Sequence, residues 1–145
     1  MQTLFTLGYQ GHSILTFLDV LRTYGITTLI DVRERPYSRK PDFSKKRLEA
    51  HLAAEQIAYL HLVELGTPKL LRDEVRRSKN YPAFFAAVTP LIEAEEAALQ
   101  AALALATTTA CALLCYEGPV ETCHRLAVAN ALAQRAAGAL QVVHL

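Results

Sequence analysis

The chain has 145 residues, of which 52% are apolar and 20% are charged, and its formal net charge is only +1. These values predict one folded domain over residues 1–145 and exclude a disordered chain. The small net charge also argues against a protein dedicated to binding nucleic acid. We expect a cytoplasmic protein without a membrane span, because neither a leader pattern nor a run of about 18 apolar residues occurs.

The first quarter of the chain alternates strand and helix patterns. Residues 4–7 predict a strand, and a helix is expected from Ser13, its N-cap residue, until Gly25 ends it. Residues 27–32 (TTLIDV) are rich in β-branched residues and carry no charge before the aspartate. This pattern predicts a strand in the centre of a sheet, covered on both faces.

The same alternation continues after a proline-containing loop. Phe43, Ser44 and Leu48 have the spacing of a hydrophobic staple, which predicts a helix over 44–55. Residues 57–62 then predict a third strand.

The middle of the chain is predicted to be helical throughout. A polar, exposed helix is expected over 68–77, and Pro82 can open another helix. Pro90 is expected to break or kink the helical region, and the alanine-rich residues 91–106 follow as a helix by propensity.

Two strands and one helix complete the predicted elements. Strands are expected over 110–116 and 140–144, with a helix over 123–137 between them. Repeated alternation of strand and helix predicts an α/β fold. We expect a single three-layer, Rossmann-like domain with a mainly parallel sheet of about five strands.

Ligands of open parallel sheets bind beyond the carboxyl ends of the strands. Most of the unusual polar residues of this chain follow predicted strands and should therefore meet at that edge. They are Gly8, Tyr9, His12, Asp31, Arg33, Arg35, His61, Glu64, Tyr116, Glu117, Cys123, His124 and Arg125.

Cys123 is the strongest candidate for a reactive group. With Thr122 as N-cap residue, its thiol would lie in the first turn of a helix, where free N–H groups favour the thiolate. A start at Pro119 would instead leave a packed cysteine inside the helix, and both alternatives remain open. His124 and Glu117 are candidate proton-transfer groups, although in a helix His124 would point about 100° away from Cys123.

Two arginines are candidates for binding an anionic ligand. Arg125 and Arg33 could each make a two-pronged contact with phosphate, sulfate or carboxylate. Each could equally form an internal ion pair, and Asp31, at a predicted buried strand end, is a candidate partner.

The three cysteines are expected to be free thiols, because they form an odd, clustered set. Cys111 should lie in the core. Cys115, Cys123 and His124 are soft metal ligands, but their spacing is not that of a usual zinc motif, so we expect no metal and no cofactor. Sequence motifs for nucleotide phosphates, dinucleotides and serine esterases are absent.

Basic residues are concentrated in one segment. Residues 33–47 contain seven Lys and Arg residues and two acids, Glu34 and Asp42. This segment is either a positive patch for phosphates or a solvated surface.

Several motifs occur in order: TLGYQGHS, LIDVRERPYSR, LGT, LLCYEGPVETCHR and VVHL. On these motifs the chain resembles the DUF488 family of small prokaryotic proteins, which has no assigned function. The resemblance implies an α/β fold and a site at the matching positions. These are Gly8, Tyr9, Asp31, Arg33, Pro36, Ser38, Gly66, Cys115, Glu117, Cys123, His124 and Arg125.

Two main hypotheses about function follow. The first is an enzyme acting on a phosphate-bearing or other anionic ligand, with Cys123 as nucleophile or redox thiol and Glu117 or His124 moving protons. The second is a non-catalytic module that binds a nucleotide or nucleic acid through Arg33, Arg125 and segment 33–47. A thiolate and histidine metal site is a weaker third alternative.

Overall fold

A computed structural model describes all residues, 1–145, as one α/β unit. Its five strands are β1 (Gln2–Gly8), β2 (Thr28–Asp31), β3 (Ala58–His61), β4 (Cys111–Cys115) and β5 (Leu140–His144). They form one sheet in the order β3-β2-β4-β1-β5, and every neighbouring pair is parallel. The predicted α/β, Rossmann-like fold is confirmed.

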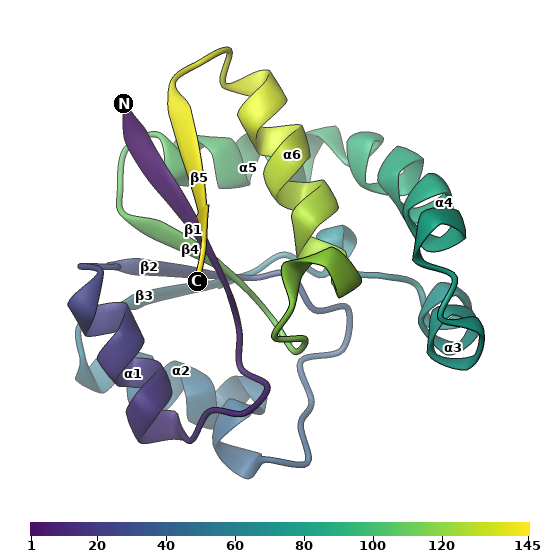
Figure 1. The fold of residues 1–145 in the computed structure, drawn as a ribbon. Coiled ribbons are helices and arrows are strands. Elements are labelled where there is room, and N and C mark those ends of the chain that lie inside the picture. The colour runs from purple at the N-terminus through teal and green to yellow at the C-terminus, as the bar shows by residue number, and fades with distance from the viewer.

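Five of the six helices cover the sheet in two layers (Figure 1). One layer contains α1 (Ile14–Thr23) and α2 (Lys45–Ala54), which pack with β-strand side chains into one hydrophobic cluster. The other contains α4 (Tyr81–Glu93), α5 (Glu96–Ala106) and α6 (Arg125–Arg135), which build the larger cluster. Helix α3 (Lys69–Ser78) buries no residue and lies beside α4. None of the helices combines the length and apolar character needed to cross a membrane.

The sequence patterns located most elements correctly. All four residues of β2 are buried, as expected of an interior strand. Phe43 and Leu48 are both buried in the same cluster at the start of α2, as the predicted staple requires. Cys111 is completely buried in the core.

The helical region does not break at Pro90, so this part of the prediction was wrong. Helix α4 continues through Pro90 to Glu93, and the chain breaks only before α5 begins at Glu96. Pro90 and Ala86 lie on the exposed face of α4, where water can hydrate the carbonyl group that a proline cannot bond.

Ser13 caps helix α1 as predicted. Its side chain accepts a hydrogen bond from the N–H of Thr16, and the Thr16 hydroxyl accepts one from the N–H of Ser13. We therefore expect Ser13→Ala to lower the free energy of unfolding by about 1 kcal/mol, whereas Ser13→Gly costs only a few tenths. Urea denaturation of the three proteins measures both differences, and equal losses would contradict the capping role.

Candidate active site

The segment between β4 and α6 contains three of the candidate site residues, Glu117, Cys123 and His124. A 3-10 turn, η3 (Val120–Thr122), ends in an extended Cys123, with φ −128° and ψ 138°, and His124 is the N-cap residue of α6. The prediction that Cys123 lies in the helix, with Thr122 as its cap, was therefore wrong. The Cys123 thiol still lies at the helix start, because its Sγ is 3.5 Å from the backbone nitrogen of Arg125.

Because Cys123 is not helical, its side chain turns to the same side as that of His124. The Sγ atom of Cys123 lies 3.9 Å from Nδ1 of His124, and the Sγ atom of Cys115 lies 3.6 Å from the same nitrogen. All three atoms lie within 4.8 Å of one another. Glu117 borders this cluster, with its Oε2 atom 3.4 Å from the sulfur of Cys115.

Burial of the cluster is nearly complete. Cys115, Cys123 and His124 are 6%, 1% and 5% exposed, whereas Glu117 is half-buried. Glu117 is therefore more accessible to solvent than either cysteine.

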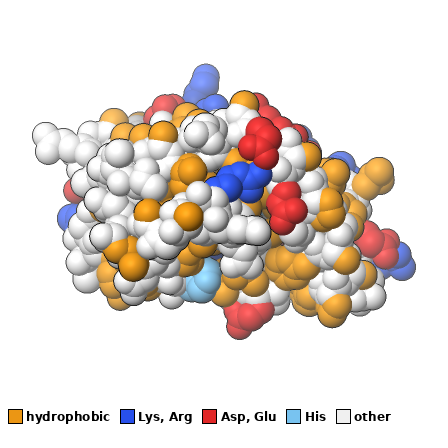
Figure 2. Space-filling view, turned by 90° about the horizontal axis from the view of Figure 1, so that it is seen from above, with side chains coloured by type: hydrophobic (Ala, Val, Ile, Leu, Met, Phe, Trp, Pro, Cys, Tyr) orange, Lys and Arg blue, Asp and Glu red, His pale blue; other side chains and the backbone are white.

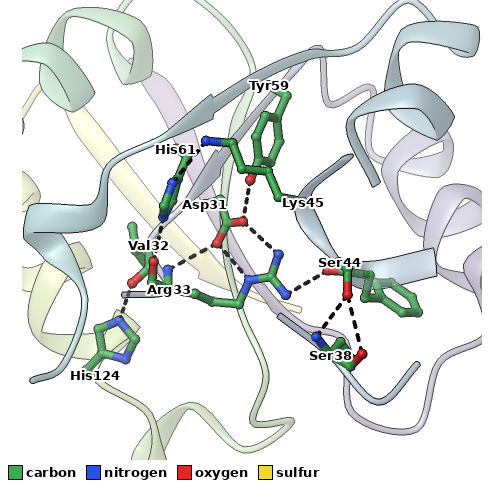
Figure 3. A network of polar contacts seen from close by, with 10 residues as sticks. Asp31, Val32, Arg33, Ser38, Ser44, Lys45, Tyr59, His61 and His124 are labelled. Atoms are coloured by element: carbon green, nitrogen blue, oxygen red, sulfur yellow. Dashed lines mark hydrogen bonds and ion pairs between the residues drawn. The ribbon is translucent and has the colours of Figure 1, made fainter. Parts of the chain in front are cut away.

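The imidazole of His124 is oriented by the backbone of β2. Its Nε2 atom lies 2.7 Å from the carbonyl oxygen of Val32, as Figure 3 shows. A carbonyl oxygen can only accept, so Nε2 carries a hydrogen and donates it. The Nδ1 atom is thereby directed at both cysteines.

The electrostatics of the cluster separate the two thiols. Burial by itself would raise the pKa of Cys123, but hydrogen bonds from Cys115 and His124 and the charges of His124 and Arg125 hold it well below the usual thiol range. The hydrogen bond to Cys123, together with burial, raises the pKa of Cys115. Burial and the Cys123 charge also raise the pKa of Glu117.

Arg125 binds the protein itself. It is completely buried, and its guanidinium group donates to the carbonyl oxygens of Glu117 and Gly118 and to the hydroxyl of Thr6. Its contacts fix the loop after β4, so the expected contact with a ligand anion is not supported by this geometry. No carboxylate pairs with this buried cation.

Arg33 forms the internal ion pair that the sequence left open. Its Nε and Nη2 atoms lie 2.9 and 2.7 Å from the two carboxylate oxygens of Asp31, and Nη1 donates to the carbonyl of Phe43 at 2.8 Å. Tyr59 donates to the same carboxylate at 2.6 Å, and burial together with that negative charge raises its pKa (Figure 3). This network holds the loop after β2 in place.

Gly8 and Tyr9 have structural positions at the end of β1. A Cβ atom on Gly8 would lie 1.7 Å from the carbonyl oxygen of Glu117, so only glycine fits there. The Tyr9 ring is buried, stacks on Phe43 at 4.5 Å and contacts Tyr116 edge-on at 5.2 Å. It thereby joins the loop after β4 to the loop after β2.

The basic segment forms an exposed surface. In Figure 1 the loop between β2 and α2 extends from the carboxyl edge of the sheet toward the bottom of the view. We define the basic loop as Arg35, Tyr37, Ser38, Arg39, Lys40, Ser44, Lys45 and Lys46. The face seen from above in Figure 2 shows only scattered charges among hydrophobic and uncharged side chains.

The comparison with family models assigns the chain. Residues 13–132 match the model described as "Domain of unknown function DUF488". The chain belongs to the DUF488 family. No curated protein and no solved structure matches this DUF488 protein.

The structure thus divides the predicted site of the DUF488 protein into three groups. Cys115, Cys123 and His124 form one cluster, which Glu117 borders; Gly8, Tyr9, Asp31, Arg33 and Arg125 hold the surrounding loops; Ser38 lies in the basic loop. Sequence reasoning missed the roles of Tyr37 and Tyr59. An aromatic residue within a basic segment was the available signal for Tyr37, whereas nothing in the sequence pairs Tyr59 with Asp31.

Proposed function

We propose that this protein is an enzyme that binds a phosphate-bearing ligand, a nucleotide or single-stranded nucleic acid, on the basic loop and acts on it at the neighbouring cysteine and histidine cluster. One observation carries the proposal. Five exposed cations of the basic loop have no carboxylate partner: Arg35, Arg39, Lys40, Lys45 and Lys46. Unpaired cations on one loop attract phosphate groups.

The basic loop also offers space and an aromatic ring. A cavity of about 740 Å³ is lined by Tyr37, Ser38, Ser44, Lys45 and other residues of the segment 36–47. Tyr37 is 77% exposed, and the guanidinium carbon of Arg35 lies 5.9 Å from the centre of its ring. An exposed ring beside cations suits a base that stacks while its phosphates meet the lysines. We therefore favour a nucleotide or single strand over inorganic anions.

The basic loop and the cluster are joined by short connections at one edge of the sheet. Val32, whose carbonyl accepts the hydrogen bond from His124, lies three residues before Arg35, the first residue of the basic loop. Tyr9 contacts both Phe43, near the far end of the loop, and Tyr116, next to Cys115. A ligand on the loop would therefore lie on the side of the molecule where Cys123, His124 and Glu117 can act.

Binding is tested with fluorescently labelled single-stranded RNA, single-stranded DNA and a labelled nucleotide, by anisotropy at increasing salt. We expect affinity that falls with salt, and we expect the variant with Arg39, Lys40, Lys45 and Lys46 all changed to Gln to lose it. For a single strand, the slope of log K against log salt should become shallower by about 0.7 for each phosphate contact removed.

A charge-matched control lies on and beside α3. Changing Lys69, Arg76, Arg77 and Lys79 to Gln removes four exposed cations away from the basic loop, and this variant should bind nearly as the unchanged protein does. If the two variants lose the same amount of affinity, the binding depends on the overall charge of the protein and not on the basic loop. No binding at low salt would reject the proposal.

Chemistry at the cluster is tested separately from binding. Cys123→Ser should keep the affinity for the labelled strand within about twofold, because Cys123 lies outside the basic loop. It should also lose any turnover of nucleotides or strands that chromatography and mass spectrometry detect with the unchanged protein. If no turnover is found for the unchanged protein, the proposed enzyme becomes a binding protein.

A further inference from the structure

We propose that Cys115, Cys123 and His124 bind one divalent metal ion, with zinc as the best match, and leave its fourth position open beside Glu117. The metal site stands on the geometry of the cluster alone. One part of the inference rests on the proposed function: that the open position of the metal faces the ligand bound on the basic loop.

Two of the three distances within the cluster are close to those of a tetrahedral site. Zinc binds thiolate sulfur at about 2.3 Å and imidazole nitrogen at about 2.0–2.1 Å, which sets neighbouring ligand atoms roughly 3.5–3.8 Å apart. The two sulfur to nitrogen distances, 3.6 Å for Cys115 and 3.9 Å for Cys123, nearly match this value. The third pair, the two sulfur atoms, lies within 4.8 Å, so binding an ion requires the sulfurs to approach each other by no more than about 1 Å.

His124 has the orientation of a metal ligand. Histidines that bind metals usually donate their other ring N–H to a carbonyl or carboxylate, which fixes the ring. Here Nε2 of His124 donates to the carbonyl oxygen of Val32 (Figure 3), at a distance of 2.7 Å. Nδ1 is the atom that lies near both sulfurs. Metal binding requires both thiols and Nδ1 to be unprotonated, and any protons that they carry pass to solvent.

The surroundings also suit bound thiolates. Soft sulfur ligands with imidazole favour zinc over calcium or magnesium. The guanidinium group of Arg125 is buried without a carboxylate partner, and the backbone N–H of Arg125 points at Cys123. A negatively charged sulfur next to this cation is less costly than one in an apolar core.

Three protein ligands and one open position are typical of catalytic zinc sites. Glu117, which borders the cluster, is half-buried, and its carboxylate touches Cys115. We place the open position beside this carboxylate, where water or the ligand on the basic loop could reach the ion.

The test uses untagged protein, reduced, stripped with a chelator and dialysed against zinc or cobalt(II) without any nucleotide. We expect one ion per chain, a zinc Kd of about 1 μM or tighter, and thiolate-to-cobalt charge-transfer absorption. Less than about a tenth of an ion per chain, or a cobalt spectrum without sulfur ligation, would overturn the inference. A third result would also overturn it. Protein isolated without reductant would contain a Cys115–Cys123 disulfide, and after reduction of that disulfide the protein would still fail to bind metal.

Substitutions identify the ligands. Cys115→Ser, Cys123→Ser and His124→Asn should each weaken zinc binding by about 100-fold or more, with circular dichroism used to confirm folding. Cys111→Ala removes a buried thiol of the same strand and should leave zinc binding unchanged. Equal weakening by Cys111→Ala would contradict the assignment.

Glu117→Gln tests the open position. We expect its zinc affinity to stay within about threefold of the unchanged protein, and a loss as large as that of Cys115→Ser would make Glu117 the fourth ligand. Metal binding and anisotropy are measured independently, so a protein that binds zinc but no oligonucleotide refutes only the proposed function. A protein that binds oligonucleotide but no zinc refutes only the metal site.

Discussion

Replacing Asp31 by alanine is expected to lower the free energy of unfolding by about 3–5 kcal/mol, because it leaves a buried arginine without its partner. Asp31 is completely buried and accepts both prongs of Arg33, the backbone N–H of Arg33 and the hydroxyl of Tyr59. Urea denaturation, followed by circular dichroism, measures the loss. The loop after β2 should also become more open to proteolysis.

Two companion variants separate the ion pair from its surroundings. Asp31→Ala combined with Arg33→Met removes both charges and should be less destabilised than Asp31→Ala alone. Tyr59→Phe removes only one hydrogen bond and should cost about 0.5–1.5 kcal/mol. Arg33→Met is also measured alone, and if the double variant is as unstable as the sum of Asp31→Ala and Arg33→Met, the two residues are not energetically coupled.

Gly8→Ala is the second change with a large expected effect. The added methyl carbon would lie 1.7 Å from the carbonyl oxygen of Glu117 and 2.4 Å from its carbonyl carbon. Both are backbone atoms, so the loop after β4 must move away from β1. We expect a loss of about 3 kcal/mol or more in the free energy of unfolding, at the upper end of overpacking effects.

Gly118→Ala is the matched control in the same loop. Its added carbon would have Gln10 Oε1 as nearest neighbour at 3.6 Å, which is ordinary contact. Stability should therefore change by less than about 1 kcal/mol. Faster alkylation of Cys115 and Cys123 in Gly8→Ala, but not in Gly118→Ala, would show that the close approach at Gly8 keeps the cluster closed. Equal stability of the two variants would contradict this role.

The fold was predictable because its local signals agree with one another. Ser13, the staple of Phe43 and Leu48, and the buried TLID strand each have one strong local interpretation, and the structure confirms all three. Alternation of strands and helices then predicts a parallel sheet without knowledge of the strand order. The edge where the polar residues gather follows from the same rule.

The fate of the polar side chains was not predictable in the same way. Arg33 and Arg125 have the same chemistry whether they bind a ligand or a backbone carbonyl, and only the path of the loops decides between these uses. The extended backbone at Cys123 depends on how η3 ends, which sequence propensity does not determine. The approach of Cys115 to Cys123 and His124 therefore required the structure.

The order of the strands has a consequence for synthesis of the chain. Strand β1 is made first, yet it pairs only with β4 and β5, which come from the other end of the sequence. During translation, β1 can therefore find no native neighbour until most of the chain has emerged from the ribosome. Such long-range pairing is slow to form, so β1 stays without its native partners until late in synthesis.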